Sequence, residues 1–201
     1  ANTLTIATAS GTYSGVMSGT GSLTISGGTQ TLSGANTYSG TTTINSGATL
    51  ALSTAGAIAN SSGVANSGTF DISATTSGAS IITLSGAGGV NIAGKTLTIT
   101  NGSTTYSGVM SGASGNLTIS GGTQVLSGAN TYTGTTTVSG GTLSVTGSLS
   151  DSTAVAVSAG ATYNVGASDT IGALSGAGSV TLNANTLTIA TASGTYSGVM
   201  S

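Results

Sequence analysis

The chain has few side chains that could do acid, base or metal chemistry. Its charged residues are Asp71, Lys95, Asp151 and Asp169, and its 201 residues include no Glu, Arg, His or Cys. Without His there is no Ser-His-Asp triad, and without Cys there is no disulfide or thiolate metal site. We therefore predict no catalytic residue, no metal site and no cofactor, and we expect the chain not to be an enzyme.

Asp151 and Asp169 form the one plausible carboxylate pair, because their separation in the chain is slightly less than one expected coil. They could approach each other at a turn and share acid-base work, or they could be two separate turn aspartates. The Gly- and Asp-rich nonapeptide of calcium-binding β-rolls is missing, so calcium has little support. We favour two turn aspartates.

Asp71 and Lys95 each have an uncharged counterpart elsewhere in the chain. Phe-Asp-Ile at Asp71 recurs as Tyr-Asn-Val at Asn164, and Lys95 corresponds to Asn185 in Ala-Asn-Thr-Leu. Because Asn cannot exchange a proton as Asp or Lys can, general acid-base catalysis at these positions is disfavoured. Both are interpreted as solvated outward residues.

The tyrosines are the stronger candidates for binding. Exposed rings could stack on sugars and give weak multivalent contacts, or they could pack at corners with the hydroxyl on water or a backbone group. We favour packing and keep glycan contact as the alternative. The candidate contact residues are Tyr13, Tyr38, Tyr106 and Tyr132.

An internal repeat must position these side chains. The segment 1–18 recurs without change at 184–201, which sets a long period of 183 positions. Thr-Tyr-Ser-Gly-Val-Met-Ser-Gly at Thr12 recurs at Thr105, and Gly-Ala-Asn-Thr-Tyr at Gly34 recurs at Gly128. Such periods indicate a stacked repeat architecture. We predict one continuous segment over 1–201, with half-repeats 1–93 and 94–183 and a new repeat from 184.

Apolar residues alternate with Thr, Ser, Ala and Asn at period 2, which is typical of short strands. Successive Leu-x-Ile-like pairs recur at an average spacing of about 23 residues, so we expect four coils per half-repeat. The chain is predicted to be all-β, a right-handed parallel β-helix with about 23 residues per coil and about eight coils per 183-residue repeat. At ~4.8 Å per coil, one repeat is roughly 38 Å tall. An up-and-down membrane barrel is the alternative, but aromatics are only 3% and the strands are short.

One line of stacked apolar side chains is expected along the helix. Its members are Leu4, Leu23, Leu50, Phe70 and Leu97. The polar side chains are neutral because like charges stacked ~4.8 Å apart would repel.

Three segments resemble the autotransporter-associated β-strand repeat of bacterial passenger regions. They are Leu32–Ser53 (LSGANTYSGTTTINSGATLALS), Leu126–Val145 (LSGANTYTGTTTVSGGTLSV) and Ile171–Ile189 (IGALSGAGSVTLNANTLTI). The resemblance implies a right-handed β-helix exported to the bacterial cell surface. It implies no catalytic residues.

We therefore expect a structural segment of an extracellular fibre, filament or stalk, with an adhesin or polysaccharide-binding passenger as the alternative. The expected partners are further copies of the repeat, joined in the same chain or stacked end to end, and glycans or other cells under the alternative. One Lys and no Arg cannot neutralise a phosphate backbone, so nucleic acid is not expected. Membrane anchoring is expected only through parts of the protein outside residues 1–201.

Overall fold

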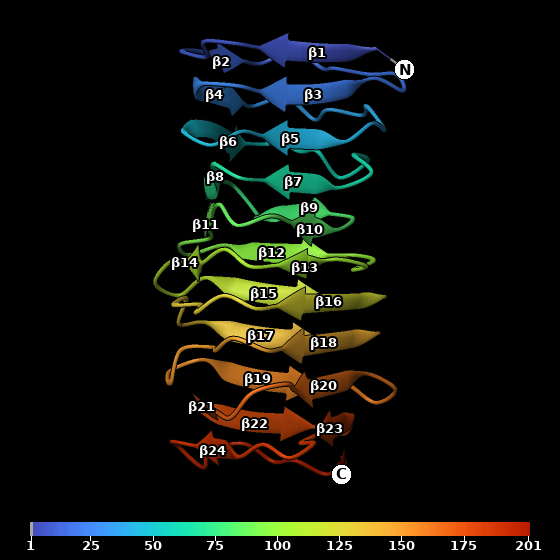
Figure 1. The fold of residues 1–201 in the computed structure, drawn as a ribbon, viewed down its shortest axis with the longest axis vertical. Helices are drawn as coiled ribbons and strands as arrows, with labels where there is room; N and C mark the ends of the chain where they lie inside the picture. Colours follow the sequence, from blue (N-terminus) through green and yellow to red (C-terminus); the bar gives the residue numbers. More distant parts are fainter. Residues whose placement is uncertain (1) are drawn as a thin grey trace.

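The computed structural model describes residues 2–201, so the first position of the predicted segment 1–201 lies outside the described residues. Short strands, β1 to β25, follow one another with only turns and bends between them, and no helix occurs in the described range. That range also contains no helix long and apolar enough to cross a membrane. All paired strands run parallel to their neighbours, which are one coil away in the chain, and the coils stack along a single axis (Figure 1). The fold is therefore a parallel β-solenoid, as predicted.

Face 1 runs the length of the solenoid. A bridge between Gly86 and Tyr106 links its two sheets. Its strands are β1 (Thr3–Ile6), β3 (Ser22–Ile25), β5 (Thr42–Ile44), β7 (Val64–Asn66), β10 (Leu84–Ser85), β13 (Thr105–Tyr106), β16 (Thr123–Leu126), β18 (Thr142–Val145), β20 (Thr162–Val165), β23 (Ser179–Thr181) and β25 (Val199–Met200).

Face 2 is regular in its first half and less so later, where single backbone hydrogen bonds such as Thr131 N to Met110 O join the coils. Its six-stranded sheet contains β2 (Thr12–Tyr13), β4 (Gly28–Leu32), β6 (Ala48–Thr54), β8 (Thr69–Thr75), β11 (Gly89–Asn91) and β14 (Met110–Ser111). A separate two-stranded sheet of β21 (Asp169–Ile171) and β24 (Leu187–Ile189) is assigned to the same face, because each of these strands directly follows a face 1 strand in the chain.

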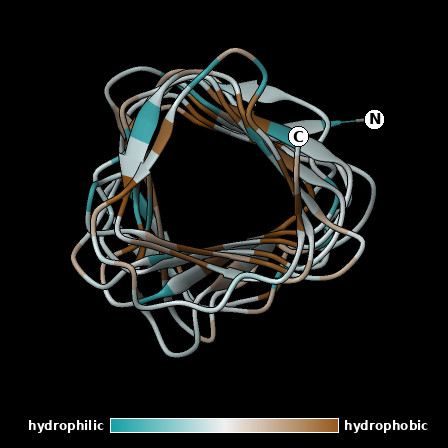
Figure 2. Ribbon diagram, turned by 90° about the horizontal axis from the view of Figure 1, so that it is seen from below, coloured by the Kyte–Doolittle hydropathy of each residue, from teal (hydrophilic) through white to brown (hydrophobic). Residues whose placement is uncertain are grey.

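Face 3 completes each coil. Its strands are β9 (Ala79–Ile81), β12 (Thr96–Ile99), β15 (Asn116–Ile119), β17 (Thr135–Val138), β19 (Ala154–Val157) and β22 (Ala173–Gly176). In the view along the axis the coils lie over one another and enclose a common interior (Figure 2). Strand residues alternate between buried and partly exposed, as period 2 predicts.

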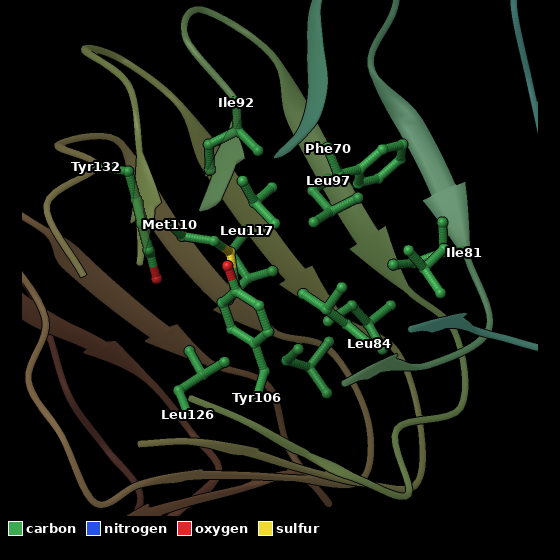
Figure 3. Packing of buried hydrophobic residues seen from close by; sticks show 14 of the residues in the cluster. Phe70, Ile81, Leu84, Ile92, Leu97, Tyr106, Met110, Leu117, Leu126 and Tyr132 are labelled. Atoms are coloured by element: carbon green, nitrogen blue, oxygen red, sulfur yellow. The ribbon is translucent and has the colours of Figure 1, made fainter. Parts of the chain in front are cut away.

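The inward side chains of the three faces form one continuous apolar core. Phe70, Leu97, Leu117 and Met110 come from different strands and are fully buried together (Figure 3). No coil has a core of its own, because each buries its apolar side chains against the coils above and below. The core is therefore a product of stacking.

A ladder of glycines lines the corner between faces 1 and 2. A Cβ atom at any of the last four would overlap the carbonyl oxygen of the ladder glycine one coil earlier. Glycine lets the backbones of adjacent coils approach closely at this corner. The ladder is Gly68, Gly88, Gly108, Gly128 and Gly147.

The coil is shorter than predicted. Most paired residues are 19 or 20 positions apart, as in Thr3 with Ser22 and Thr49 with Thr69. The stack has about ten turns, and a 183-residue repeat spans more than nine turns instead of eight. The predicted coil length came from averaging two kinds of step. Leu4 to Leu23 is one turn within face 1, whereas Leu23 to Leu50 crosses to face 2 and spans about one and one-third turns.

The predicted single line of apolar residues was wrong for the same reason. Leu4 and Leu23 pair on face 1, Leu50 and Phe70 pair on face 2, and Leu97 lies on face 3. Each coil passes three faces, so similar Leu-containing segments need not stack on each other.

Candidate functional site

The Gly-Ala-Asn-Thr-Tyr segments place a buried asparagine at a corner of the coil. Asn130 Oδ1 accepts a hydrogen bond from Met110 N at 3.0 Å, and its Nδ2 donates to Gly128 O at 3.0 Å and Ser148 O at 3.1 Å. The side chain thus joins its own coil to the coils before and after it.

Asn36 repeats this arrangement in the first half-repeat. Its Oδ1 accepts from Met17 N at 2.9 Å, and its Nδ2 donates to Gly34 O at 2.9 Å and Ala57 O at 3.2 Å. Its exposed fraction is 4%, and that of Asn130 is 2%. Because all three bonds are made inside the protein, neither amide is left to bind a ligand.

The tyrosine of the same segment bonds to the threonine run that follows it. Tyr38 OH and Thr42 Oγ1 share a hydrogen bond of 2.6 Å, and Tyr132 OH and Thr136 Oγ1 share one of the same length. Both threonines have no exposed surface. A buried hydroxyl without a hydrogen-bond partner is destabilising, and in each copy the Tyr and Thr hydroxyls are partners of each other.

The tyrosine of Thr-Tyr-Ser-Gly-Val-Met makes a different contact. Tyr106 OH donates to Gly88 O in the preceding coil. Tyr196 OH donates to Gly178 O and to Val199 O, each at 2.8 Å. These hydroxyls also hold backbone carbonyls at a corner.

Of the four candidate glycan contacts, the structure exposes only Tyr13, at 43%. Tyr38, Tyr106 and Tyr132 are 4%, 0% and 0% exposed, so their rings have no face open for stacking on a sugar. Tyr13 lies on the first coil, and no described coil covers it from that side. The favoured interpretation, packing at a corner, therefore describes three of the four, because neighbouring coils cover both sides of an interior corner.

Burial raises the pKa of the interior tyrosines. Desolvation raises the pKa of Tyr38 from 10.0 to about 12, against a lowering from its hydrogen bond with Thr42. Desolvation likewise raises the pKa of Tyr106, Tyr132 and Tyr163. Near neutral pH these hydroxyls are uncharged. Those of Tyr38, Tyr106 and Tyr132 make hydrogen bonds, whereas the buried Tyr163 hydroxyl has no partner.

This burial predicts a loss of stability in alkali. Between about pH 10 and 12 the unfolded chain releases its tyrosine protons before the folded chain does, so the free energy of unfolding falls as pH rises. Below about pH 10 both states keep these protons and this contribution is constant. Urea unfolding across this range should show the fall, and a Tyr38→Phe variant should show a shallower one. Tyrosinate absorbance from the buried tyrosines at ordinary pKa, in protein that stays folded, would contradict the prediction.

Asp151 and Asp169 come together at one surface depression, which Ser168 and Thr186 also line. Asp169 Oδ2 accepts a hydrogen bond from Leu149 N at 2.9 Å, which joins two coils. The pKa of Asp169 is raised from its ordinary value, chiefly by partial burial; hydrogen bonds from the backbone amides of Leu149 and Thr170 oppose the rise, and the charge of Asp151 adds to it. The backbone bond gives Asp169 a structural role between coils. The prediction of two turn aspartates holds for Asp151 but was wrong for Asp169, which is the first residue of strand β21.

Asp71 lies on the outward side of β8. Its Oδ1 accepts a hydrogen bond from Ser73 N at 2.8 Å, and Asn91 in the next coil makes the same kind of local bond to Ala93 N. Asp71 and Asn91 are register partners, so Asn fits the outward position that Asp71 occupies. Residues 2–201 contain no group of three or more His, Cys, Asp or Glu side chains placed to hold a metal ion.

Comparison with known families matches two segments, 16–52 and 119–145, to the passenger-associated-transport-repeat. The two matches contain the two Gly-Ala-Asn-Thr-Tyr corners, which the structure builds with the same hydrogen bonds. Both segments are similar to that repeat. The predicted resemblance to an autotransporter passenger repeat is confirmed, and this family implies a secreted or surface-exposed protein. Neither the curated proteins nor the solved structures gave a match.

In both matched segments, Gly-Ala-Asn-Thr-Tyr and the threonine run that follows it form a structural joint between coils. Its Asn, its Tyr and the middle Thr of the run are buried. The Tyr and Thr hydroxyls bond to each other, and the Asn amide bonds to backbone groups of its own and neighbouring coils. Sequence reasoning missed that Asn36, Asn130, Thr42 and Thr136 point inward. The threonine run could have predicted the burial of the two threonines. Side chains alternate between inward and outward along a strand, and the middle residue of the run takes an inward position.

Proposed function

We propose that the chain is a segment of a rigid shaft, part of an extracellular bacterial fibre or stalk whose length is set by the number of repeats. The observation that carries this proposal is the unbroken core. Inward residues join one cluster from Ala9 to Val180, and the buried Asn, Tyr and Thr side chains of the repeat motif make hydrogen bonds within and between coils. Such a body resists bending.

The solenoid itself gives the expected scale. At about 19 or 20 residues per coil and ~4.8 Å between strands, a 183-residue unit adds about 45 Å of shaft. This replaces the roughly 38 Å expected from eight coils.

The shaft proposal is tested by changing repeat number in the native protein on cells. Adding one 183-residue unit should move an epitope beyond the shaft about 45 Å further from the cell surface, as measured by immunogold electron microscopy. An insertion of equal length made of flexible Gly/Ser sequence is the control, and its stand-off should be shorter and more variable. An unchanged stand-off, or an epitope inside the cell, would overturn the proposal.

Glycan binding is the second candidate. The hydroxyl ladders on the outer surface favour it, because Thr98, Thr118 and Thr137 are register partners on face 3. It would use these ladders and Tyr13, since the other candidate tyrosines are buried. Binding of the isolated segment to a glycan array, lost when Thr118 and Thr137 are changed to Val, would favour an adhesin.

A shaft without chemistry predicts that its few charges are dispensable. Changing Asp71, Lys95, Asp151 and Asp169 together to Asn should leave the fold and assembly intact, because Asn keeps the oxygen that accepts the local backbone bonds of Asp71 and Asp169. The unfolding midpoint and appearance in electron micrographs should match those of the unchanged protein. Loss of a binding or catalytic activity in this variant would reveal a site.

A further inference from the structure

The half-repeat is not a whole number of turns. Gln30, Leu50, Phe70, Val90 and Met110 are successive register partners on face 2, so the chain makes four turns between Gln30 and Met110. The counterpart of Gln30 in the second half-repeat is Gln124, which lies beyond Met110 but less than one further turn along, on strand β16 of face 1. The half-repeat therefore advances the chain by about four and two-thirds turns.

Other motifs follow the same rule. Tyr13 lies on face 2 in β2, Tyr106 on face 1 in β13, and Tyr196 is bridged to Gly176 at the end of β22 on face 3. The Thr-Leu-Thr-Ile segments begin on face 1 at Leu4, then face 3 at Leu97, then face 2 at Leu187. Each motif moves by one face per half-repeat.

A motif keeps its local structure when its face changes. Asn36 follows face 2 and Asn130 follows face 1, yet both bond the same three backbone groups in their own and neighbouring coils. The valine of Thr-Tyr-Ser-Gly-Val-Met is also exposed in every copy, as Val16, Val109 and Val199. The solenoid accepts one sequence on different faces because the interior is apolar on all three sides.

The terminal copies show both sides of one coil. In residues 2–18, β1 pairs with the following coil, Ile6 with Ile25. In the identical residues 185–201, β24 and β25 pair with the preceding coil, Ile171 with Ile189 and Val180 with Met200. One and the same sequence thus binds a coil like 164–183 on one side and a coil like 19–38 on the other.

We propose that the coil formed by the repeated segment 184–201 is continued by a further copy of the 183-residue repeat. The two copies would be joined through the same contacts that adjacent coils make within this chain, and the second copy would be rotated by one third of a turn relative to the first. The proposal rests on the shaft function above and specifies the geometry of its joint. One 183-residue unit spans nine and one-third turns, so three units restore the original face. A shaft of such units presents each surface feature in three directions.

An array of three full units, each carrying a small globular tag, tests this geometry. The tag is inserted at the exposed turn Ala159–Gly160 between β19 and β20, where a substituent on Gly160 meets no neighbouring atom. In electron micrographs of the purified array the tags should project in three directions, about 45 Å apart along one straight shaft. A second array with the tag at Ser46–Gly47, also an exposed turn, guards against misfolding at one insertion point.

Tags aligned along one side would overturn the rotation, and separate particles joined by flexible chain would overturn the joint. The untagged array is the control for a straight shaft. Because purified protein is used, these outcomes do not depend on where the protein resides, whereas the stand-off experiment on cells does. Failure of the joint and failure of the extracellular role are therefore distinguishable.

Discussion

Gly88→Ala should destabilise the solenoid strongly, by about 3 kcal/mol or more. A Cβ at this position would lie 2.7 Å from Gly68 N and would overlap Gly68 O in the preceding coil. Neither atom can move without breaking the stacking of coils, because both belong to the backbone. For a chain of this size the expected fall in Tm is about 6–12 °C, measured by circular dichroism.

Gly89→Ala is the matched control at the next position along the chain. A Cβ on Gly89 meets nothing within 4 Å, and the residue already belongs to strand β11. Alanine there should leave stability unchanged or raise it by up to about 1 kcal/mol, because it restricts the unfolded chain. Equal effects of the two substitutions would mean that the glycine ladder does not set the distance between coils.

Asn130→Ala should cost about 2–4 kcal/mol. The substitution removes three hydrogen bonds and leaves Met110 N, Gly128 O and Ser148 O without the side-chain partner they have now. Because the loss falls on three coils at once, denaturant unfolding should show a lower midpoint. The corresponding change of Asn36 should act in the same direction.

Asn60→Ala is the control for this experiment, since Asn60 is an exposed residue in a turn. Its effect should lie within about 0.5 kcal/mol of zero. If Asn130→Ala has little effect on stability but changes the binding of a ligand or an activity, the corner is a recognition site instead. The predicted pattern is a large stability effect confined to the buried asparagines.

Period-2 alternation was enough to predict the strands and the inward residues. Leu97 and Ile99 point inward while Thr96 and Thr98 point outward, as expected. The alternation predicts these directions because successive side chains of a strand point to opposite faces, whichever strands lie beside it. The repeats likewise indicated a stacked body, and the Gly-Ala-Asn-Thr-Tyr segments indicated a passenger-type repeat.

The sequence did not determine the coil length or the burial of the candidate tyrosines. The step from Leu4 to Leu23 keeps the face, whereas the longer step from Leu23 to Leu50 changes it, and nothing in the spacing alone distinguishes the two. Tyr106 and Tyr13 lie in identical local sequence, yet one is buried and the other is exposed.

The sequence by itself determined the strand pattern, the scarcity of charged side chains and the resemblance to a passenger repeat. The tertiary structure decided which residues meet, because the partners of each residue lie about 20 positions away, on coils whose stacking depends on every corner between them. It is this stacking that buries Asn130 and Tyr132 and turns each repeat by one face relative to the last. Local sequence sets the direction of a side chain, and only the closed coil sets what that side chain touches.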